Sequence, residues 1–198
     1  DSYERGAMFQ SILVPLDGSH FSEQSISAAA DLAAECEASL HLVHVHVPPL
    51  TSQIGVDGAF PYEGVQLGDW DEEHRRGEIE YMDRLVRAID NIPEGDLETK
   101  ILDGRVSDAI RDFAEESDVD LIVMASHGHT GVERFWLGSV TEALARRTTK
   151  PLLILRPSEG EGPLHPMEIK QVLVSLDGSD ESEAILDSVR ALGQMGAK

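Results

Sequence analysis

Short apolar runs alternate with longer amphipathic stretches along the chain. The apolar runs are bounded by turn-forming residues and predict buried strands at residues 11–16, 40–47, 97–102, 121–124 and 151–155. Apolar residues at helical spacing predict helices between them, at about residues 22–36, 71–92, 106–116 and 139–147. Strands that alternate with helices favour a parallel sheet covered by helices on both faces. We therefore predict a five-stranded, doubly wound α/β domain over residues 9–157.

This order of elements also predicts where a ligand would bind. Ligands of doubly wound sheets lie beyond the carboxyl ends of the strands, where the strand order reverses. The segments expected at that edge follow Leu16, Val47 and Met124.

The pattern of the first strand and helix occurs twice. Residues 12–32 align with residues 172–192 at a constant offset of 160, with nine identities in 21 positions and a shared core of Leu-Val-x-Leu-Asp-Gly-Ser. Internal repetition of this kind indicates a tandem architecture. We predict a linker at 158–168 and, over 169–198, the first strand and helix of a second repeat. Such a pair buries too little surface to form a domain, so either the native protein continues as a tandem protein or the segment completes a partner's fold.

The chain is strongly acidic, with 37 Asp and Glu residues against 16 Lys and Arg and a formal net charge of −21. This charge argues against a nucleic-acid or membrane-surface partner, because phosphate backbones and anionic lipids would be repelled. An anionic ligand must be held by backbone N–H groups or by a metal ion.

No apolar run approaches the roughly 20 residues of a transmembrane helix, no secretory signal is visible and Cys36 is the only cysteine, so a cytoplasmic protein is expected. Residues 1–8 are expected to be a disordered N-terminus, with a remnant of an expression tag before a native start at Met8.

The strongest chemical signal follows the fourth predicted strand. Residues 124–131 read Met-Ala-Ser-His-Gly-His-Thr-Gly, and the chain enters the fourth predicted helix at Gly138 and Ser139. Glycine lets backbone N–H groups approach a phosphate closely, and the first turn of a helix adds unpaired donors and the positive end of the helix dipole. Ser139 and Thr141 can add hydroxyl donors. These features predict an anion site that needs no lysine; the alternative is a glycine-rich turn in which Ser139 only caps the helix.

These motifs resemble those of the universal stress protein family. Its ATP-binding members share Gly-x2-Gly-x9-Gly-[Ser/Thr] between the fourth strand and the fourth helix; here Gly128, Gly138 and Ser139 match, and Ala125 replaces the first glycine. The opening Ile-Leu-Val-Pro-Leu-Asp-Gly-Ser and the later Leu-Gly-Ser-Val-Thr-Glu and Lys-Pro-Leu-Leu-Ile-Leu are also typical of the family. The resemblance spans residues 9–157 and resumes in the second repeat. It implies a Rossmann-like sheet of the adenine nucleotide alpha hydrolase type.

The resemblance further implies an ATP site, with Mg²⁺ or Mn²⁺ bound through the phosphates. The predicted nucleotide contacts are Pro15, Leu16, Asp17, Val45, Met124, Ala125, Gly128, His129, Gly138, Ser139, Val140 and Thr141. Within this set, Pro15 and Asp17 are expected to line the adenosine end, Val45 to lie near adenine, and Met124 and Ala125 to lie under the ribose. The glycines and the start of the fourth helix are expected to cradle the phosphates.

Several of the polar residues have a second interpretation. An Asp that follows a buried strand, such as Asp17, is often only a turn former or helix cap. His129 either contacts phosphate or faces solvent. His44 and His46 lie on one face of a predicted strand, but a metal site usually needs three or four ligands, so no metal bound by protein side chains is predicted. The acidic run at residues 69–73 is interpreted as an exposed helix start.

The leading hypothesis for function is an ATP-binding regulatory module of the stress response, whose nucleotide state alters its assembly or its binding to an unidentified protein partner. No side chain is clearly placed to activate water, so no catalytic residue is predicted and ATP hydrolysis is expected to be slow at most. The alternative is a nucleotide-independent interaction protein of the same fold. An adenylyl-transferring ligase would need additional catalytic residues that the sequence lacks. Whether the ligand is ATP, AMP or a cyclic nucleotide stays open.

The last predicted strand bears on assembly. Leu152–Leu155 is apolar and is expected at a sheet edge, where an unpaired strand invites another. The family pairs these strands into dimers, so the resemblance implies a homodimer through this strand.

Overall fold

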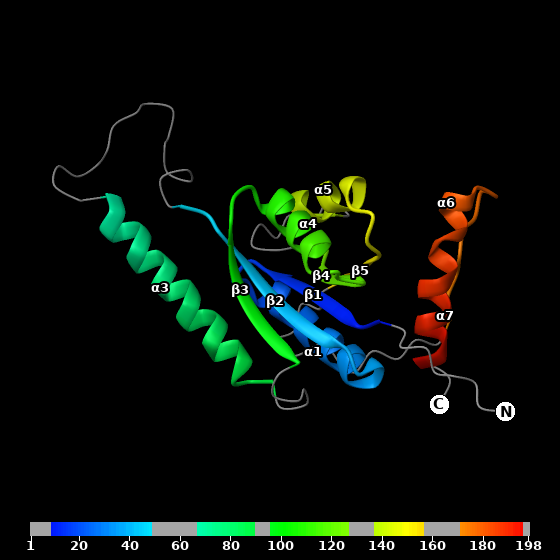
Figure 1. Ribbon diagram of the computed structural model, residues 1–198, viewed down its shortest axis with the longest axis horizontal. Helices are drawn as coiled ribbons and strands as arrows, with labels where there is room; N and C mark the ends of the chain where they lie inside the picture. The colour runs from blue at the N-terminus through cyan, green and yellow to red at the C-terminus, as the bar shows by residue number, and fades with distance from the viewer. Residues whose placement is uncertain (1–8, 49–66, 90–95, 127–136, 157–170, 196–198) are drawn as a thin grey trace.

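A parallel five-stranded sheet lies at the centre of the computed structural model (Figure 1), which describes residues 9–48, 67–89, 96–126, 137–156 and 171–195. The strands are β1 (Ser11–Leu16), β2 (Ser39–His46), β3 (Leu97–Asp103), β4 (Leu121–Ala125) and β5 (Leu152–Leu155). Their order is β3-β2-β1-β4-β5, and each neighbouring pair is parallel. The predicted doubly wound α/β fold is therefore confirmed.

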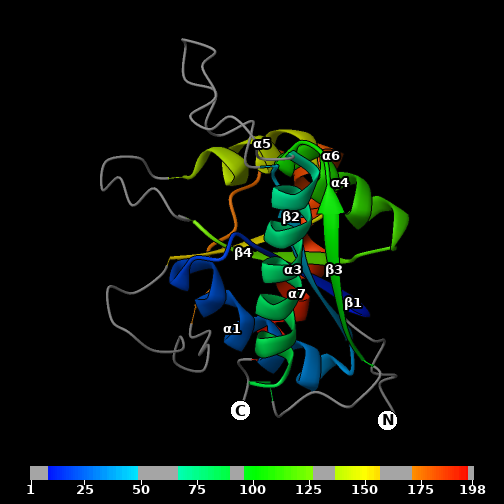
Figure 2. The same ribbon diagram turned by 90° about the vertical axis from the view of Figure 1, so that its left-hand side faces the viewer.

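Helices cover both faces of the sheet (Figure 2). Helices α1 (His20–Cys36) and α3 (Leu67–Val86) pack on one face, and α4 (Val106–Glu116) and α5 (Ser139–Arg147) pack on the other. Every residue of β1 and β4 is buried, because strands covered on both faces have no solvent side. This double burial explains why the two strands are continuous apolar runs in the sequence. The helix expected at residues 71–92 begins earlier, at Leu67, and ends at Val86.

The turn between β1 and α1 is fixed by its own side chains. Gly18 has a positive φ of 79°, a conformation that glycine adopts without steric cost. Ser19 is the N-cap of α1, and its hydroxyl accepts a hydrogen bond from the backbone N–H of Ser22 at 3.2 Å. The turn therefore delivers the chain from the carboxyl end of β1 directly into a capped helix.

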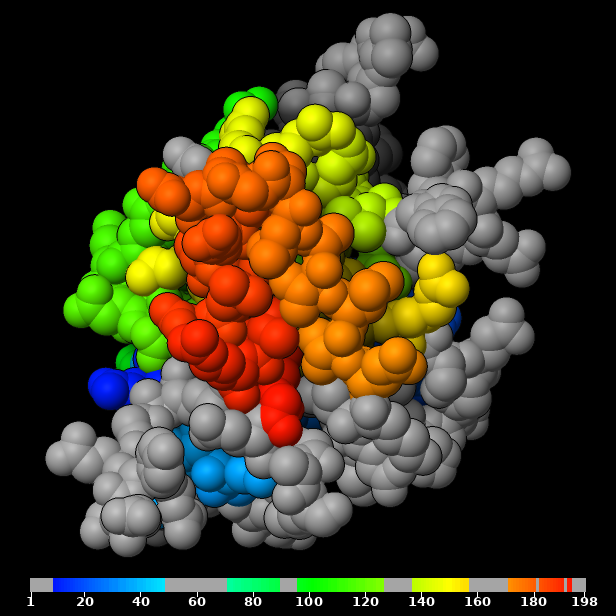
Figure 3. All heavy atoms as spheres, turned by 90° about the vertical axis from the view of Figure 1, so that its right-hand side faces the viewer, coloured from blue at the N-terminus to red at the C-terminus, as the bar shows by residue number. Residues whose placement is uncertain are grey.

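The C-terminal segment lies on the outside of the domain, where Figure 3 shows it in orange and red. It holds α6 (Asp180–Glu183) and α7 (Ile185–Met195), with Leu192 packed against the hydrophobic core. The strand expected at residues 169–176 is not observed over the described residues 171–176, which form neither helix nor strand. For residues 171–176 the prediction is wrong: none of the described strands pairs with this stretch, and an unpaired strand has no hydrogen-bond ladder to stabilise it.

Candidate functional site

A cavity of about 400 Å³ opens at the carboxyl edge of the sheet, between the ends of β1 and β4. The chain passes from β1 outward to β2 and β3 and then returns to the other side of β1 as β4, so the strand order reverses here. Doubly wound sheets bind their ligands at this position, and the volume suits a small-molecule site.

Most of the predicted nucleotide contacts surround this one cavity. Ten of the twelve line it: Pro15, Leu16, Asp17, Val45, Met124, Ala125, Gly138, Ser139, Val140 and Thr141. The other two, Gly128 and His129, lie outside the described residues. The structure thus brings together residues from β1, β2, β4 and α5 that are far apart in the sequence.

Asp17 forms the turn after β1 and also lines the cavity. Its Oδ1 accepts hydrogen bonds from the backbone N–H of Ser19 at 2.9 Å and from the Ser19 hydroxyl at 2.5 Å. Its own N–H donates to the Ser22 hydroxyl at 3.3 Å. The turn-forming interpretation of Asp17 is therefore correct, and the same carboxylate is held rigidly at the mouth of the site.

The start of α5 supplies backbone donors to the cavity. Gly138 is the N-cap residue and has no side chain to cap the helix, and its own N–H donates to the carbonyl of Ser126 at 2.7 Å. The first intrahelical bond runs from the N–H of Glu142 to the carbonyl of Gly138, so the N–H groups of Ser139, Val140 and Thr141 precede the helical ladder. These donors, with the positive end of the helix dipole, suit an anion.

Thr141 does not offer the hydroxyl donor that the sequence suggests. Its side chain is 3% exposed, and its Oγ1 donates to the carbonyl of Ala125 at 3.3 Å. This bond ties the first turn of α5 to the end of β4. Thr141 therefore positions the helix start, while Ser139 is exposed at the cavity.

The middle of the cavity is apolar. Leu16, Val45, Met124 and Ala125 are each less than 9% exposed, and Ile110 of α4 closes the wall beside them. Apolar surface with a few polar groups at its ends is the usual lining of a small-molecule site. Such a surface can bury a flat ring while the polar groups at either end fix its direction.

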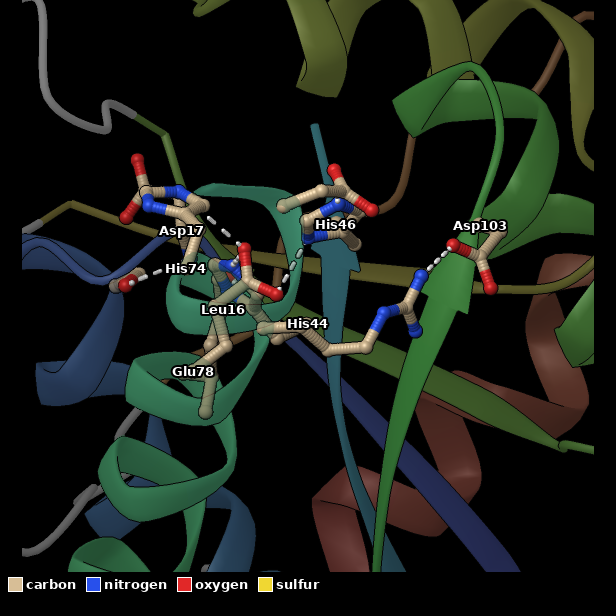
Figure 4. Close-up of polar contacts among 10 residues, drawn as sticks. Leu16, Asp17, His44, His46, His74, Glu78 and Asp103 are labelled. Atoms are coloured by element: carbon tan, nitrogen blue, oxygen red, sulfur yellow. Dashed lines mark hydrogen bonds and ion pairs between the residues drawn. The ribbon is translucent and has the colours of Figure 1, made fainter. Parts of the chain in front are cut away.

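The wall formed by β2 and α3 carries three polar residues that were not predicted as site residues. His44, His74 and Glu78 line the cavity together. Figure 4 shows the Glu78 carboxyl group between His46 on one side and His44 and His74 on the other. Glu78 is only 8% exposed, so its carboxylate is a buried charge that requires partners.

The buried partner of Glu78 is His46. Its Nδ1 lies 2.7 Å from Oε2 of Glu78, and its Nε2 lies 3.0 Å from Oδ1 of Asp71. Burial lowers the pKa of His46, but the hydrogen bonds to Asp71 and Glu78 outweigh that effect and hold its pKa above the ordinary value. The imidazolium thus joins the end of β2 to the first half of α3.

The sequence indicates that His44 and His46 share one face of a strand, but it does not indicate that polar side chains of α3 lie beside them. His44 and His46 alternate on one strand face, as expected, and that face is the one α3 covers. Asp71 lies in the acidic run expected at an exposed helix start, and its side chain is 43% exposed; it also pairs with the buried His46, which the sequence does not indicate. The spacing of Asp71, His74 and Glu78 places them along one side of α3, but only the tertiary arrangement turns that side toward the cavity.

Two other kinds of site are absent from the described part of the chain. Within it, no group of three or more His, Cys, Asp or Glu side chains is arranged to hold a metal ion. No helix in the same residues has the length and apolar character needed to cross a membrane.

Comparison with known proteins places the fold and the motifs in one family. The model of the universal stress protein family matches residues 8–156. Universal stress protein YxiE of Bacillus subtilis is 31% identical over 153 residues, which cover 75% of this chain and 100% of the relative. Universal stress protein MJ0531 of Methanocaldococcus jannaschii is 29% identical over 157 residues, or 78% of this chain and 86% of the relative.

Solved structures share the architecture. Universal stress protein UspA from Lactobacillus plantarum superimposes with a TM-score of 0.59 at 21% identity, over 74% of this chain and 97% of the other. A universal stress protein crystallised in complex with cAMP gives a TM-score of 0.52 at 24% identity, over 76% and 98% of the two chains. From the match to residues 8–156, the sequence relatives and the shared fold, the chain belongs to the universal stress protein family.

Proposed function

We propose that the cavity binds an adenine nucleotide, with ATP as the leading ligand, and that the chain is a regulatory module of the stress response. The observation that carries the proposal is the convergence of ten predicted contacts from four elements on one cavity at the reversal of strand order. A related universal stress protein of the same fold was crystallised with cAMP, which supports a nucleotide of this class.

The two ends of the cavity suit the two ends of a nucleotide. The free N–H groups at the start of α5 would receive the phosphates, because they need no cationic side chain in a chain of net charge −21. The apolar middle between β1 and β4 would receive the base and sugar. Asp17 stands at that same edge as a carboxylate acceptor for hydroxyl or amino donors.

A divalent cation fits this arrangement through the nucleotide. No group of three or more candidate metal ligands occurs among the described side chains, whereas Mg²⁺ is commonly held by phosphate oxygens and water. Bound Mg²⁺ or Mn²⁺ would offset phosphate charge. The backbone N–H groups of Ser139 and Val140 would donate to the phosphate oxygens, not to the cation.

The test is calorimetric titration of ATP with Mg²⁺ into the wild-type chain and a Gly138→Glu variant. The new carboxylate would stand at the N-cap of α5 and repel the phosphates, so saturable binding near one ATP per chain is expected for the wild type and should be lost in the variant. Gly193→Glu is the matched control, because a side chain at Gly193 meets nothing within 4 Å. Absence of binding heat and of thermal stabilisation at millimolar ATP would contradict the proposal, since a ligand at 100 times its Kd adds about 2.7 kcal/mol.

Slow hydrolysis and a cytoplasmic location belong to the same proposal. No residue of this chain is assigned to activating water, so turnover of bound ATP is expected to be slow and the bound state to be the signal read by a protein partner. A fast ATPase, measured as phosphate release under saturating ATP, would contradict this regulatory role.

A second candidate function rests on β5. This strand is at the edge of the sheet, and its residues Leu152–Leu155 are apolar and half-buried. An apolar edge strand is a template for pairing, so we propose a homodimer through β5, which would serve either a nucleotide-dependent module or a nucleotide-independent interaction protein. Light scattering at micromolar concentration should give twice the chain mass; a monomer would contradict the proposed dimer.

The C-terminal segment is proposed to be the opening of a second repeat of the same family. The support is the sequence match at an offset of 160 and a capped turn that forms the same hydrogen bonds in both copies. Because residues 171–176 form no strand and expose Leu173, the segment lacks the neighbours that a first strand has in the complete domain.

A further inference from the structure

The two oxygens of the Glu78 carboxylate differ in how closely they are held. Oε2 lies 2.7 Å from Nδ1 of His46. Oε1 lies 3.4 Å from Nε2 of His44 and 3.6 Å from Nε2 of His74, which are long separations for hydrogen bonds between charged groups. The side chain is 9% exposed and lines the cavity, so Oε1 is a buried acceptor on the cavity wall.

The positions of the protons follow from the neighbours of each ring nitrogen. His44 Nδ1 lies 2.9 Å from the carbonyl oxygen of Leu16, which can only accept, so Nδ1 carries the proton. Nε2 of His44 then donates to Oε1 of Glu78 only in a doubly protonated ring, and the contact of 3.4 Å is long in either case. His74 is half-exposed on the surface. Neither ring gives Oε1 a contact as short as the 2.7 Å contact between His46 and Oε2.

His46 and Asp71 hold the carboxylate in place. Both nitrogens of His46 face carboxylate oxygens, at 2.7 Å and 3.0 Å, and the ring is 2% exposed. Two donors are needed there, so His46 is an imidazolium between two anions. Arg75, on the same helix, is paired with Asp103 of β3. The cluster therefore holds Oε2 of Glu78 firmly and leaves Oε1 with only the two longer contacts, beside cavity-lining His44 and His74.

We propose that Glu78 is a ligand-recognition residue: its Oε1 accepts a hydrogen bond from a donor on the nucleoside part of the bound nucleotide, and His46 and Asp71 are its positioning residues. This inference rests on the proposed nucleotide function. The donor is an amino group of the base or the 2′-hydroxyl of the sugar, which present the same chemistry to a carboxylate. With Asp17, Glu78 makes one end of the cavity acidic, while the start of α5 makes the other end attractive to anions. The cavity would therefore bind a nucleotide in one direction only.

The Glu78→Gln variant tests this role because it exchanges an acceptor for a donor. His46 Nδ1 donates to the inner atom, so the amide oxygen must take that position and the amide NH₂ must face the cavity. Binding of three probes is measured by calorimetry with Mg²⁺: ATP, inosine triphosphate, which lacks the amino group, and 2′-deoxy-ATP, which lacks one hydroxyl. Glu80→Gln is the matched control, an exposed glutamate two residues away on α3.

The wild type should prefer ATP over one of the two analogues by about tenfold to a hundredfold, the usual effect of a hydrogen bond to a charged group. Glu78→Gln should weaken ATP by a similar factor and remove that preference, while Glu80→Gln changes neither. Loss of the preference against inosine triphosphate would assign the bond to the amino group, and loss of the preference against 2′-deoxy-ATP would assign it to the hydroxyl.

Two results would overturn the inference alone while leaving the proposed function intact: wild-type protein that binds all three probes equally, or Glu78→Gln protein that keeps the wild-type order of preference. The first of these needs no variant, so the inference is tested even if Glu78→Gln does not fold. A wild type that binds none of the probes would overturn the proposed function and this inference together.

Discussion

The chain contains the same strand–turn–helix sequence twice, and the two copies keep the same turn but not the same strand. In the first copy, Ser19 N–H and the Ser19 hydroxyl donate to Oδ1 of Asp17 at 2.9 and 2.5 Å. In the second, Ser179 N–H and its hydroxyl donate to Oδ1 of Asp177 at 3.0 and 2.7 Å. The turn is therefore a property of the local sequence.

The match extends through the first turn of each helix. The hydroxyls of Ser19 and Ser179 accept from the N–H groups three residues later at 3.2 and 3.1 Å, and the preceding glycines have φ angles of 79° and 84°. These groups are all within six residues of one another, so neither copy needs the rest of the domain to form them.

The two copies differ in the burial of the residues that precede the turn. Leu13 is 0% exposed in β1, whereas the equivalent Leu173 is 95% exposed and belongs to no strand. A strand is stabilised by the strands beside it and by the helices over it, and β1 has β2 and β4 as neighbours. The comparison shows that helix caps are encoded locally, while strands depend on partners distant in the sequence.

The largest difference in stability between the two copies is expected when the equivalent leucines, Leu13 and Leu173, are replaced by alanine. Leu13→Ala should lower the free energy of unfolding by about 2–5 kcal/mol, because it opens a cavity in a closed core. Leu173→Ala should change it by less than about 0.5 kcal/mol, as for other surface substitutions. Urea denaturation of both variants measures the difference, and equal losses would show that the second copy is packed as the first is.

A smaller difference in stability is expected when the N-cap serine of each copy is replaced by alanine. Ser19→Ala should cost about 0.5–2 kcal/mol, because it removes the hydroxyl that caps α1, a helix integrated into the core. Ser179→Ala removes the same bond at the start of α6, so its effect should be confined to faster amide exchange in residues 180–195. A loss of global stability in Ser179→Ala equal to that in Ser19→Ala would contradict the proposed independence of the second copy.

The smallest effect is the titration of Asp177. Its hydrogen bonds from Ser179 and Ser182 lower its pKa to about 2. Because the folded pKa is depressed, the carboxylate supports the turn above the ordinary value of 3.8, and this support is lost as the pH falls toward 2. NMR titration of the carboxyl carbon should show the low pKa, and Ser179→Ala should raise it toward the ordinary value. An ordinary pKa in the unmodified chain would mean that the second turn does not form.

The same distinction explains how much could be predicted from the sequence. The runs that became β1 and β4 were recognisable because burial on both faces requires apolar residues at every position. Residues 171–176 align with residues 11–16 and share the Leu-Val-x-Leu pattern. Their prediction as a strand is wrong because the pattern cannot report whether a neighbouring strand is present.

The residues of the candidate site also fall into two groups, those in local sequence motifs and those that depend on tertiary packing. Asp17, Gly138 and Ser139 belong to local motifs at strand and helix ends, and the position of these ends follows from the topology of the sheet. Glu78 lies within an ordinary acidic helix, and its burial depends on where α3 packs after a long connection from β2. Pairing with His46, 32 residues earlier, leaves no local signal in the sequence.

The most direct test of nucleotide binding in the first copy is an NMR titration of the ¹⁵N-labelled chain with ATP and Mg²⁺. Saturable shifts are predicted for the amides of Asp17, Val45, Ser139 and Val140, which surround the cavity, with no shift for residues 177–182, which share the turn but have no sheet edge beside it. Unchanged spectra at millimolar ATP, or shifts of equal size in both turns, would contradict the claim that the cavity, rather than the turn motif, binds the nucleotide.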